Sequence, residues 1–211
     1  MKRWLVATMS VPLALIFLML TPASVQAEET TCNGSLGAVT VDNLRVPQNG
    51  SCSLDGTRVE GTIYVENGAT LTALRIRVIG NIQAEGAAAV NVALDSTVGG
   101  SIQVKQGAAA QIDDVQVTGD IQFEANDAAL GATNNIVGGN VQVIQNSGGV
   151  HIAQNVIDGN LQCKENDPPP TGGNNVVKGS AEDQCEQLTG PGVIDPPTVL
   201  IVQSYLPMVQ R

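Results

Sequence analysis

A short pattern of apolar and polar residues returns along most of the chain. In Gly80-Asn81-Ile82-Gln83-Ala84, apolar side chains occupy the second and fourth positions after the glycine, and a glutamine lies between them. Comparable stretches begin at Gly61, Gly80, Gly100, Gly119, Gly139, Gly159 and Gly179, so their spacing is always 19 or 20 residues. A period this regular predicts a repeat architecture in which every repeat forms one structural unit.

Each repeat predicts three short strands. Alternation of apolar and polar residues after the lead glycine is typical of a strand with one buried and one exposed face. A second apolar pair follows later in the repeat, as in Val90 and Val92, and a third apolar position comes two residues before each lead glycine. The polar residues of the first strand are Tyr64, Gln83, Gln103, Gln122, Gln142 and Gln162.

Glycine and asparagine predict the corners between these strands. One of them lies seven positions after most lead glycines, and Asn135, Asn155 and Asn175 each lie four positions before one. Both residue types adopt a left-handed backbone at low cost, so we expect them at the bends. We also expect stacked asparagines to bond to one another and to the backbone of the next turn.

Three strands and three corners per repeat predict an all-β, single-domain, three-sided parallel β-helix, a solenoid of about seven turns. Strands of successive turns would pair about 4.8 Å apart, and like side chains would form ladders inside the coil. No helical periodicity competes with this pattern after residue 27.

The period, apolar columns and corners of residues 38–185 resemble those of right-handed parallel β-helix repeat proteins, many of them secreted by bacteria. This resemblance implies a right-handed coil. The Gly-x-Ile-x-Val repetition is more distantly similar to the polymer-forming bactofilin family, whose β-helices join end to end. The chain departs from that family in its signal peptide, its cysteines and its longer turn.

The first 27 residues are typical of a secretory signal peptide. A basic start at Lys2 and Arg3 precedes an apolar run, and small residues end at a predicted cleavage point after Ala27. A retained membrane anchor is the alternative. Cleavage would leave no transmembrane segment and place the protein outside the cell or on its surface. We therefore divide the chain into a signal peptide (1–27), an N-terminal cap (28–54), the β-helix (55–188), and a Gly/Pro-rich linker with an apolar C-terminal tail (189–211).

The tail contains one apolar stretch, residues 198–209, which is too short to span a bilayer. Two interpretations stay open for it. Its last residues, 205–211, resemble short tails that close some secreted bacterial proteins, or the tail forms a strand that packs back on the coil.

Cysteine spacing predicts two disulfides. Cys32 and Cys52 lie 20 residues apart, and Cys163 and Cys185 lie 22 apart, each about one repeat. If one repeat is one turn, each pair lies on adjacent turns within bonding reach. Metal ligation is the rival interpretation, but the sequence has no C-x-x-C motif and its one histidine, His151, is distant from both pairs.

Charge and composition exclude several functions. Loss of Lys2 and Arg3 with the signal peptide changes the net charge from −10 to −12. An acidic chain lacks the basic footprint that nucleic acid requires, so we expect no nucleic-acid partner. Only three aromatic residues remain after cleavage, namely Tyr64, Phe123 and Tyr205, which leaves little for stacking on bases or sugars.

Candidate catalytic groups are sparse. Asp113 and Asp114 are adjacent on a predicted strand and should point to opposite sides, and His151 should point outward alone. Glu85, Lys105 and Glu124 should stack as alternating charges on the surface. We therefore predict no catalytic, cofactor-binding or metal-binding residue and no cofactor. The candidate interaction face is the column Gln83, Gln103, Gln122, Gln142 and Gln162.

These observations favour a secreted, non-enzymatic structural or surface-interaction protein, whose candidate partners are an extracellular polysaccharide, another surface protein or a second copy. One alternative is a β-helix that binds or degrades polysaccharide, as a lyase or hydrolase, which rests on analogy of fold alone. A second alternative is a protein that polymerises end to end.

Overall fold

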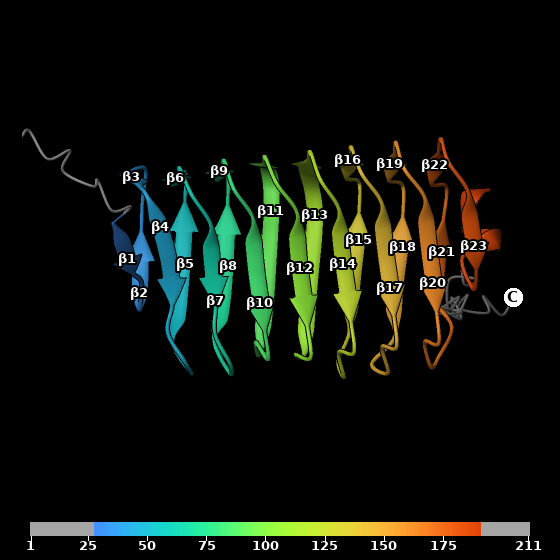
Figure 1. Cartoon of the computed structure of the whole chain (residues 1–211), viewed down its shortest axis with the longest axis horizontal. Helices are drawn as coiled ribbons and strands as arrows, with labels where there is room; N and C mark the ends of the chain where they lie inside the picture. Colours follow the sequence, from blue (N-terminus) through green and yellow to red (C-terminus); the bar gives the residue numbers. More distant parts are fainter. Residues whose placement is uncertain (1–27, 191–211) are drawn as a thin grey trace, which may run out of the picture.

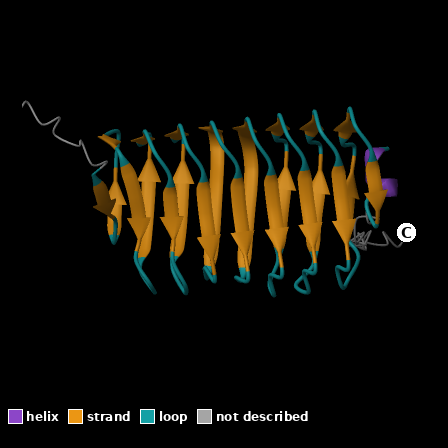
Figure 2. Cartoon of the chain, in the orientation of Figure 1, coloured by secondary structure: helices purple, strands orange, loops and turns teal. Residues whose placement is uncertain are grey.

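The computed structural model describes residues 28–190 and confirms the expected parallel β-helix. Short strands stack along one axis into a solenoid of about eight turns (Figure 1). The single helical element of the described region is η1, a 3-10 helix at Glu186–Thr189, at the C-terminal end of the coil (Figure 2). The predicted signal peptide and most of the predicted C-terminal linker and tail lie outside the described residues.

The first face of the solenoid is a parallel sheet of nine strands. Its register places Ile82 beside Ile102 and Ile102 beside Ile121, so equivalent positions of successive repeats are neighbours. In spatial order, the strands are β1 (Glu29–Thr31), β4 (Asn43–Val46), β7 (Ile63–Val65), β10 (Ile82–Glu85), β12 (Ile102–Lys105), β14 (Ile121–Glu124), β17 (Val141–Ile144), β20 (Leu161–Lys164) and β23 (Ala181–Asp183).

The second and third faces are joined because β11 (Ala89–Val98) and β13 (Ala109–Val117) run across the corner between them. The remaining strands of the second face are β2 (Gly34–Leu36), β5 (Ser51–Asp55), β8 (Thr70–Leu74), β15 (Leu130–Thr133), β18 (Val150–Ala153) and β21 (Thr171–Gly173). Those of the third face are β3 (Thr40–Val41), β6 (Arg58–Val59), β9 (Arg77–Val78), β16 (Ile136–Val137), β19 (Val156–Ile157) and β22 (Val176–Val177).

The core consists of aliphatic ladders from all three faces. The first ladder, Ile63, Ile82, Ile102, Ile121, Val141 and Leu161, is fully buried. Phe123 is the only aromatic side chain in the core of the described region. The alternation read from the sequence therefore assigns inward and outward positions correctly along these strands.

Most left-handed corner residues lie one position before an asparagine, so the expectation that these asparagines adopt that conformation is wrong. The left-handed residues are Gln106, Ala125, Gln145 and Glu165 at one corner, and Asp114, Asn134, Gln154 and Asn174 at the next. Glycine does serve as the left-handed residue at Gly68. At six of these bends an asparagine follows the left-handed residue and turns its side chain inward, whereas Gly107 follows Gln106 and Val115 follows Asp114.

The inward asparagines form two buried ladders that satisfy the backbone at the corners. The Asn146 side chain donates to Phe123 O (3.0 Å) and to Asn166 Oδ1 (2.9 Å). Its own Oδ1 accepts from the backbone N and from Nδ2 of Asn126. A second ladder repeats this geometry, and its members are Asn135, Asn155 and Asn175.

The lead positions require glycine because a polar side chain of the preceding turn occupies the space that a Cβ atom would need. Asn81 Oδ1 accepts from the backbone N of Ser101 at 2.8 Å, and a Cβ on Gly100 would lie 2.2 Å from that oxygen. Ser101 Oγ does the same for Asp120 N, at 3.0 Å. The repeating glycine therefore admits a third polar ladder at the third corner.

Both ends of the described coil carry a disulfide. Cys32 bonds to Cys52 and Cys163 bonds to Cys185, with Cα–Cα distances of 5.5 and 5.2 Å, and these are the pairs that the spacing predicts. Residues 28–54, expected as a cap, contribute strands in solenoid register, since Leu44 is the neighbour of Ile63. Residues 28–190 contain no helix long and apolar enough to cross a membrane.

Candidate interaction face

The outward side of the first face carries a chain of hydrogen-bonded amides, which we call the glutamine ladder: Gln103, Gln122, Gln142, Gln162 and the terminal Glu182. Gln103 Nε2 donates to Gln122 Oε1 at 2.8 Å, and the next two steps measure 3.0 and 2.9 Å. Gln162 Nε2 then donates to Glu182 Oε2 at 2.9 Å. Parallel strands in register produce this chain because identical side chains lie one turn apart.

The ladder runs in one direction and has one open end. Every Nε2 donates toward the C-terminal end, and Gln103 Oε1 accepts no bond from residues 28–190. Gln83 lies beside Gln103 in the strand register, yet its side chain forms no hydrogen bond within the described region. Two amide groups at this end are therefore available to a partner, whereas the inner amides bond to each other.

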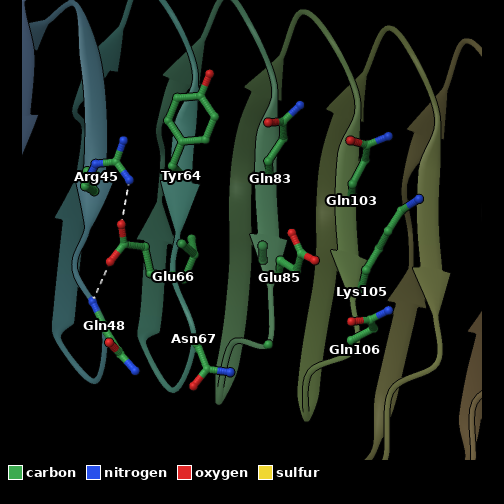
Figure 3. A pocket seen from close by; sticks show the side chains of 13 residues that line it. Arg45, Gln48, Tyr64, Glu66, Asn67, Gln83, Glu85, Gln103, Lys105 and Gln106 are labelled. Carbon is green, nitrogen blue, oxygen red and sulfur yellow. Dashed lines mark hydrogen bonds and ion pairs between the residues drawn. The ribbon is translucent and has the colours of Figure 1, made fainter.

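A shallow groove of about 750 Å³ lies at the open end. Figure 3 shows Tyr64, Gln83 and Gln103 in one row along the face, with charged side chains in a second row beside them. That second row contains Glu66, Glu85 and Lys105. The groove thus combines one aromatic ring, free amides and charges of both signs.

Arg45 closes the N-terminal side of the groove through two carboxylates. Its Nε and Nη2 donate to Glu29 at 2.7 and 2.8 Å, and its Nη1 donates to Glu66 Oε1 at 2.5 Å. Its guanidinium carbon lies 5.6 Å from the centre of the Tyr64 ring, a cation–π distance. The backbone N–H of Gln48 also donates to Glu66 Oε2, at 2.9 Å (Figure 3).

These bonds change the acidity of the three groups. Hydrogen bonding to Arg45 lowers the pKa of Glu29 and of Glu66 below the ordinary value of 4.5, and the Gln48 N–H adds to the effect at Glu66. The same carboxylates raise the pKa of Arg45. The cluster is therefore a fixed ion triplet, which holds its charges rather than exchanging protons at neutral pH.

The expected stack of alternating charges forms only in part. Lys105 Nζ pairs with Glu124 Oε2 at 2.9 Å, on its C-terminal side. Glu85 is the strand neighbour of Lys105 but makes no ion pair within residues 28–190. It therefore stands in the groove as an exposed, unpaired carboxylate.

The other ionisable residues noted in the sequence lie apart from this groove. Asp113 Oδ1 accepts from Thr133 Oγ1 and Asn134 Nδ2, while Asp114 Oδ2 accepts from the backbone N of Asp95. His151 is exposed, with Nδ1 3.2 Å from Thr171 Oγ1. In the described part of the chain, no three His, Cys, Asp or Glu side chains gather as metal ligands would.

Sequence reasoning missed the Arg45 triplet. Arg45 is the strand neighbour of Tyr64 and occupies the same column as the glutamines. No lead glycine precedes it, since Asp42 stands where the repeat would place one. Alignment on the apolar pair Leu44 and Val46 would have revealed that column.

Fold and face together define a β-solenoid with one amide-lined side. Comparison of the chain with protein-family models, with curated proteins and with solved structures finds no match.

Proposed function

We propose that the chain is a secreted, non-enzymatic structural or surface-interaction protein, and that the glutamine ladder with its open end is the surface that a partner contacts. One observation carries this proposal: the amides of four successive turns bond in a single row along one side of the coil. A row fixed in this way presents repeated polar groups at small entropic cost, because the side chains are already ordered.

The chemistry of the row favours a neutral, polar partner. Amides donate and accept hydrogen bonds but do not exchange protons, so the row can bind without catalysing. The candidate partners are an extracellular polysaccharide, another surface protein and a second copy of the chain. All three present hydroxyl or amide groups that match Gln83 and the free Oε1 of Gln103.

Binding to immobilised polysaccharides and to the chain itself tests this proposal. We expect Gln83→Leu with Gln103→Leu, the variant of the open end of the ladder, to weaken binding about tenfold, as loss of two hydrogen bonds would. Gln111→Leu is the matched control because Gln111 is an exposed glutamine on the second face. Equal binding by the ladder variant and the control would contradict the proposed surface.

Polysaccharide binding is the second candidate, and the groove favours it. Tyr64 supplies a ring on which a sugar could stack, and Gln83, Glu85 and Gln103 supply polar groups beside it. Tyr64→Ala should abolish saccharide binding if the groove holds the sugar, and should leave binding intact if only the ladder does. Release of unsaturated or reducing ends from a panel of uronate polymers would instead establish an enzyme.

End-to-end polymerisation is the third candidate, and the C-terminal end opposes it. Helix η1 lies against the last turn, where Leu188 is buried and its carbonyl accepts from Asn175 Nδ2 at 2.8 Å. A second coil could stack there only after η1 moved away. We expect no filaments by negative-stain microscopy, and filaments would favour this candidate over the other two.

A further inference from the structure

One outward column of the third face changes its chemistry along the coil. In its N-terminal half the column carries Arg58, Arg77, Thr97 and Gln116. In its C-terminal half it carries Ile136, Val156 and Val176, which are 56%, 38% and 59% exposed. We call these three residues the aliphatic ladder.

The aliphatic ladder is a continuous strip rather than scattered residues. Ile136 is the strand neighbour of Val156, and Val156 is the neighbour of Val176, so the side chains stand about 4.8 Å apart. Seven large apolar residues are exposed in the described region, and three of them gather here in successive turns. Apolar side chains that gather on a surface indicate a covering partner, whereas single ones do not.

The chain itself leaves the solenoid beside this strip. Gly190, the last described residue, accepts through its carbonyl a hydrogen bond from the backbone N of Asn174, two residues before Val176. Asn175 holds the preceding segment, since its backbone N and its Nδ2 both donate to Leu188 O. Whatever follows Gly190 therefore begins next to one end of the aliphatic ladder.

Length and composition of the remaining chain fit the strip. Residues 191–197 can extend about 23 Å, which exceeds the roughly 10 Å from Val176 to Ile136. Four aliphatic residues follow, Val199-Leu200-Ile201-Val202, and no charged residue occurs between Pro196 and Val209. The N-terminal half of the column, with Arg58 and Arg77, offers no such match.

We propose that residues 199–202 of the same molecule cover the aliphatic ladder. The segment would remove Ile136, Val156 and Val176 from water and hold η1 against the last turn from outside. A second copy of the chain is the competing occupant, which the experiment below separates. The strip lies on the third face, so this proposal stands or falls independently of the glutamine ladder.

Hydrogen–deuterium exchange on the purified chain, with its tail confirmed by mass spectrometry, tests the docking. We expect amides of residues 199–202 to exchange at least about tenfold more slowly than in a free peptide of the same sequence. Replacing Ile136, Val156 and Val176 by threonine should return the amides of residues 199–202 to the exchange rate of the free peptide. Threonine already occupies this column at Thr97, and unchanged exchange in β14 would verify that the variant folds.

The control is Arg77→Thr, which makes the same replacement in the polar half of the column and should leave protection unchanged. Docking within one molecule predicts protection that does not depend on protein concentration. Protection that rises with concentration would assign the strip to a second copy and overturn the proposal. Exchange of 199–202 at the peptide rate in the unaltered chain, or loss of the tail from the secreted protein, would overturn it too.

Discussion

Single asparagines hold the corners of this solenoid, and each does so with several bonds at once. The Asn146 side chain bonds to two backbone groups of the preceding turn and to two neighbouring asparagines while it is buried. Side-chain amides satisfy backbone groups that the bends leave without strand partners. Such a residue has no simple substitute, because no apolar side chain replaces these donors and acceptors.

Replacement of Asn146 by alanine should lower the free energy of unfolding by about 2–4 kcal/mol, because buried backbone groups at Phe123 and Asn126 lose their partners. Urea unfolding measures the change. Gln145→Ala is the control, since alanine already occupies the equivalent left-handed position at Ala125. A loss as large in Gln145→Ala would contradict the role assigned to the ladder.

Acid should weaken the Arg45 triplet specifically. The pKa values of Glu29 and Glu66 are lowered in the folded protein, so their stabilisation is present above pH 4.5 and disappears as the pH falls through the folded values. In Arg45→Gln we expect both carboxyl pKa values to rise toward 4.5. Carbon-detected NMR titration of the side chains measures this, and unchanged values would show that Arg45 is not the cause.

The residue scale is also where sequence reasoning failed. Asparagine tolerates a left-handed backbone, so its columns were expected at the bends, yet Gln106, Ala125 and Gln145 adopt that conformation instead. Stacking decides between the two positions, since the asparagine side chain gains more as a buried bridge between turns than as a bend residue. Propensity alone does not contain this information, because it describes one residue without its neighbours above and below.

At the scale of the strand, alternation controls both packing and surface. In β12, Ile102 is fully buried while Gln103 lies on the outer face and bonds to the next turn. The same alternation occurs in β14, β17 and β20. One residue of slippage would therefore move the aliphatic core to the surface and bury the glutamine ladder.

Ile102→Ala should reduce the free energy of unfolding by about 2–5 kcal/mol, because it leaves a cavity between rigid neighbouring turns. Gln103→Ala, one residue away, should cost only about 1 kcal/mol, because it removes one hydrogen bond at the surface. Urea unfolding of both variants measures the difference. Similar losses would mean that the outer ladder contributes as much to stability as the core does.

Strands with a lead glycine could be predicted from the sequence, whereas those before Gly61 could not be placed. Glu29 and Asn43 are strand neighbours only 14 residues apart, so the first turn breaks the period of 19 or 20. For that reason Glu29 escaped the repeat alignment, and Arg45, which lines the groove, escaped it because no lead glycine precedes it. The partial pairing of Glu85, Lys105 and Glu124 was also hidden, since side-chain direction between equivalent neighbours is a tertiary property.

At the scale of the whole molecule, the coil is nearly one-dimensional. Each turn contacts only the turns on either side, so stability is close to a sum over turns and their interfaces. The register of β12 with β14 equals that of β14 with β17, which makes interior turns interchangeable.

Deletion of residues 120–139, one complete turn, should therefore leave a folded protein. Gly119 would join Asn140, and Val141 would take the place of Ile121 beside Ile102. We expect a retained β-sheet spectrum and a urea m-value lower by about a tenth, because less surface is exposed on unfolding. Deletion of residues 130–139 is the control. Removing half a turn should destroy the register, and a folded product would contradict the modular description.

The one-way order of the glutamine ladder has an electrical consequence. Each amide is a dipole, and a row that always donates toward the same end sums to a positive pole at Gln162 and a negative pole at Gln103. Glu182 places a carboxylate against the positive pole, as acidic residues do at the start of α-helices. At the opposite pole, Gln103 Oε1 accepts no hydrogen bond within the described region, and Gln83 is the strand neighbour of Gln103. The two ends of the glutamine ladder therefore carry partial charges of opposite sign.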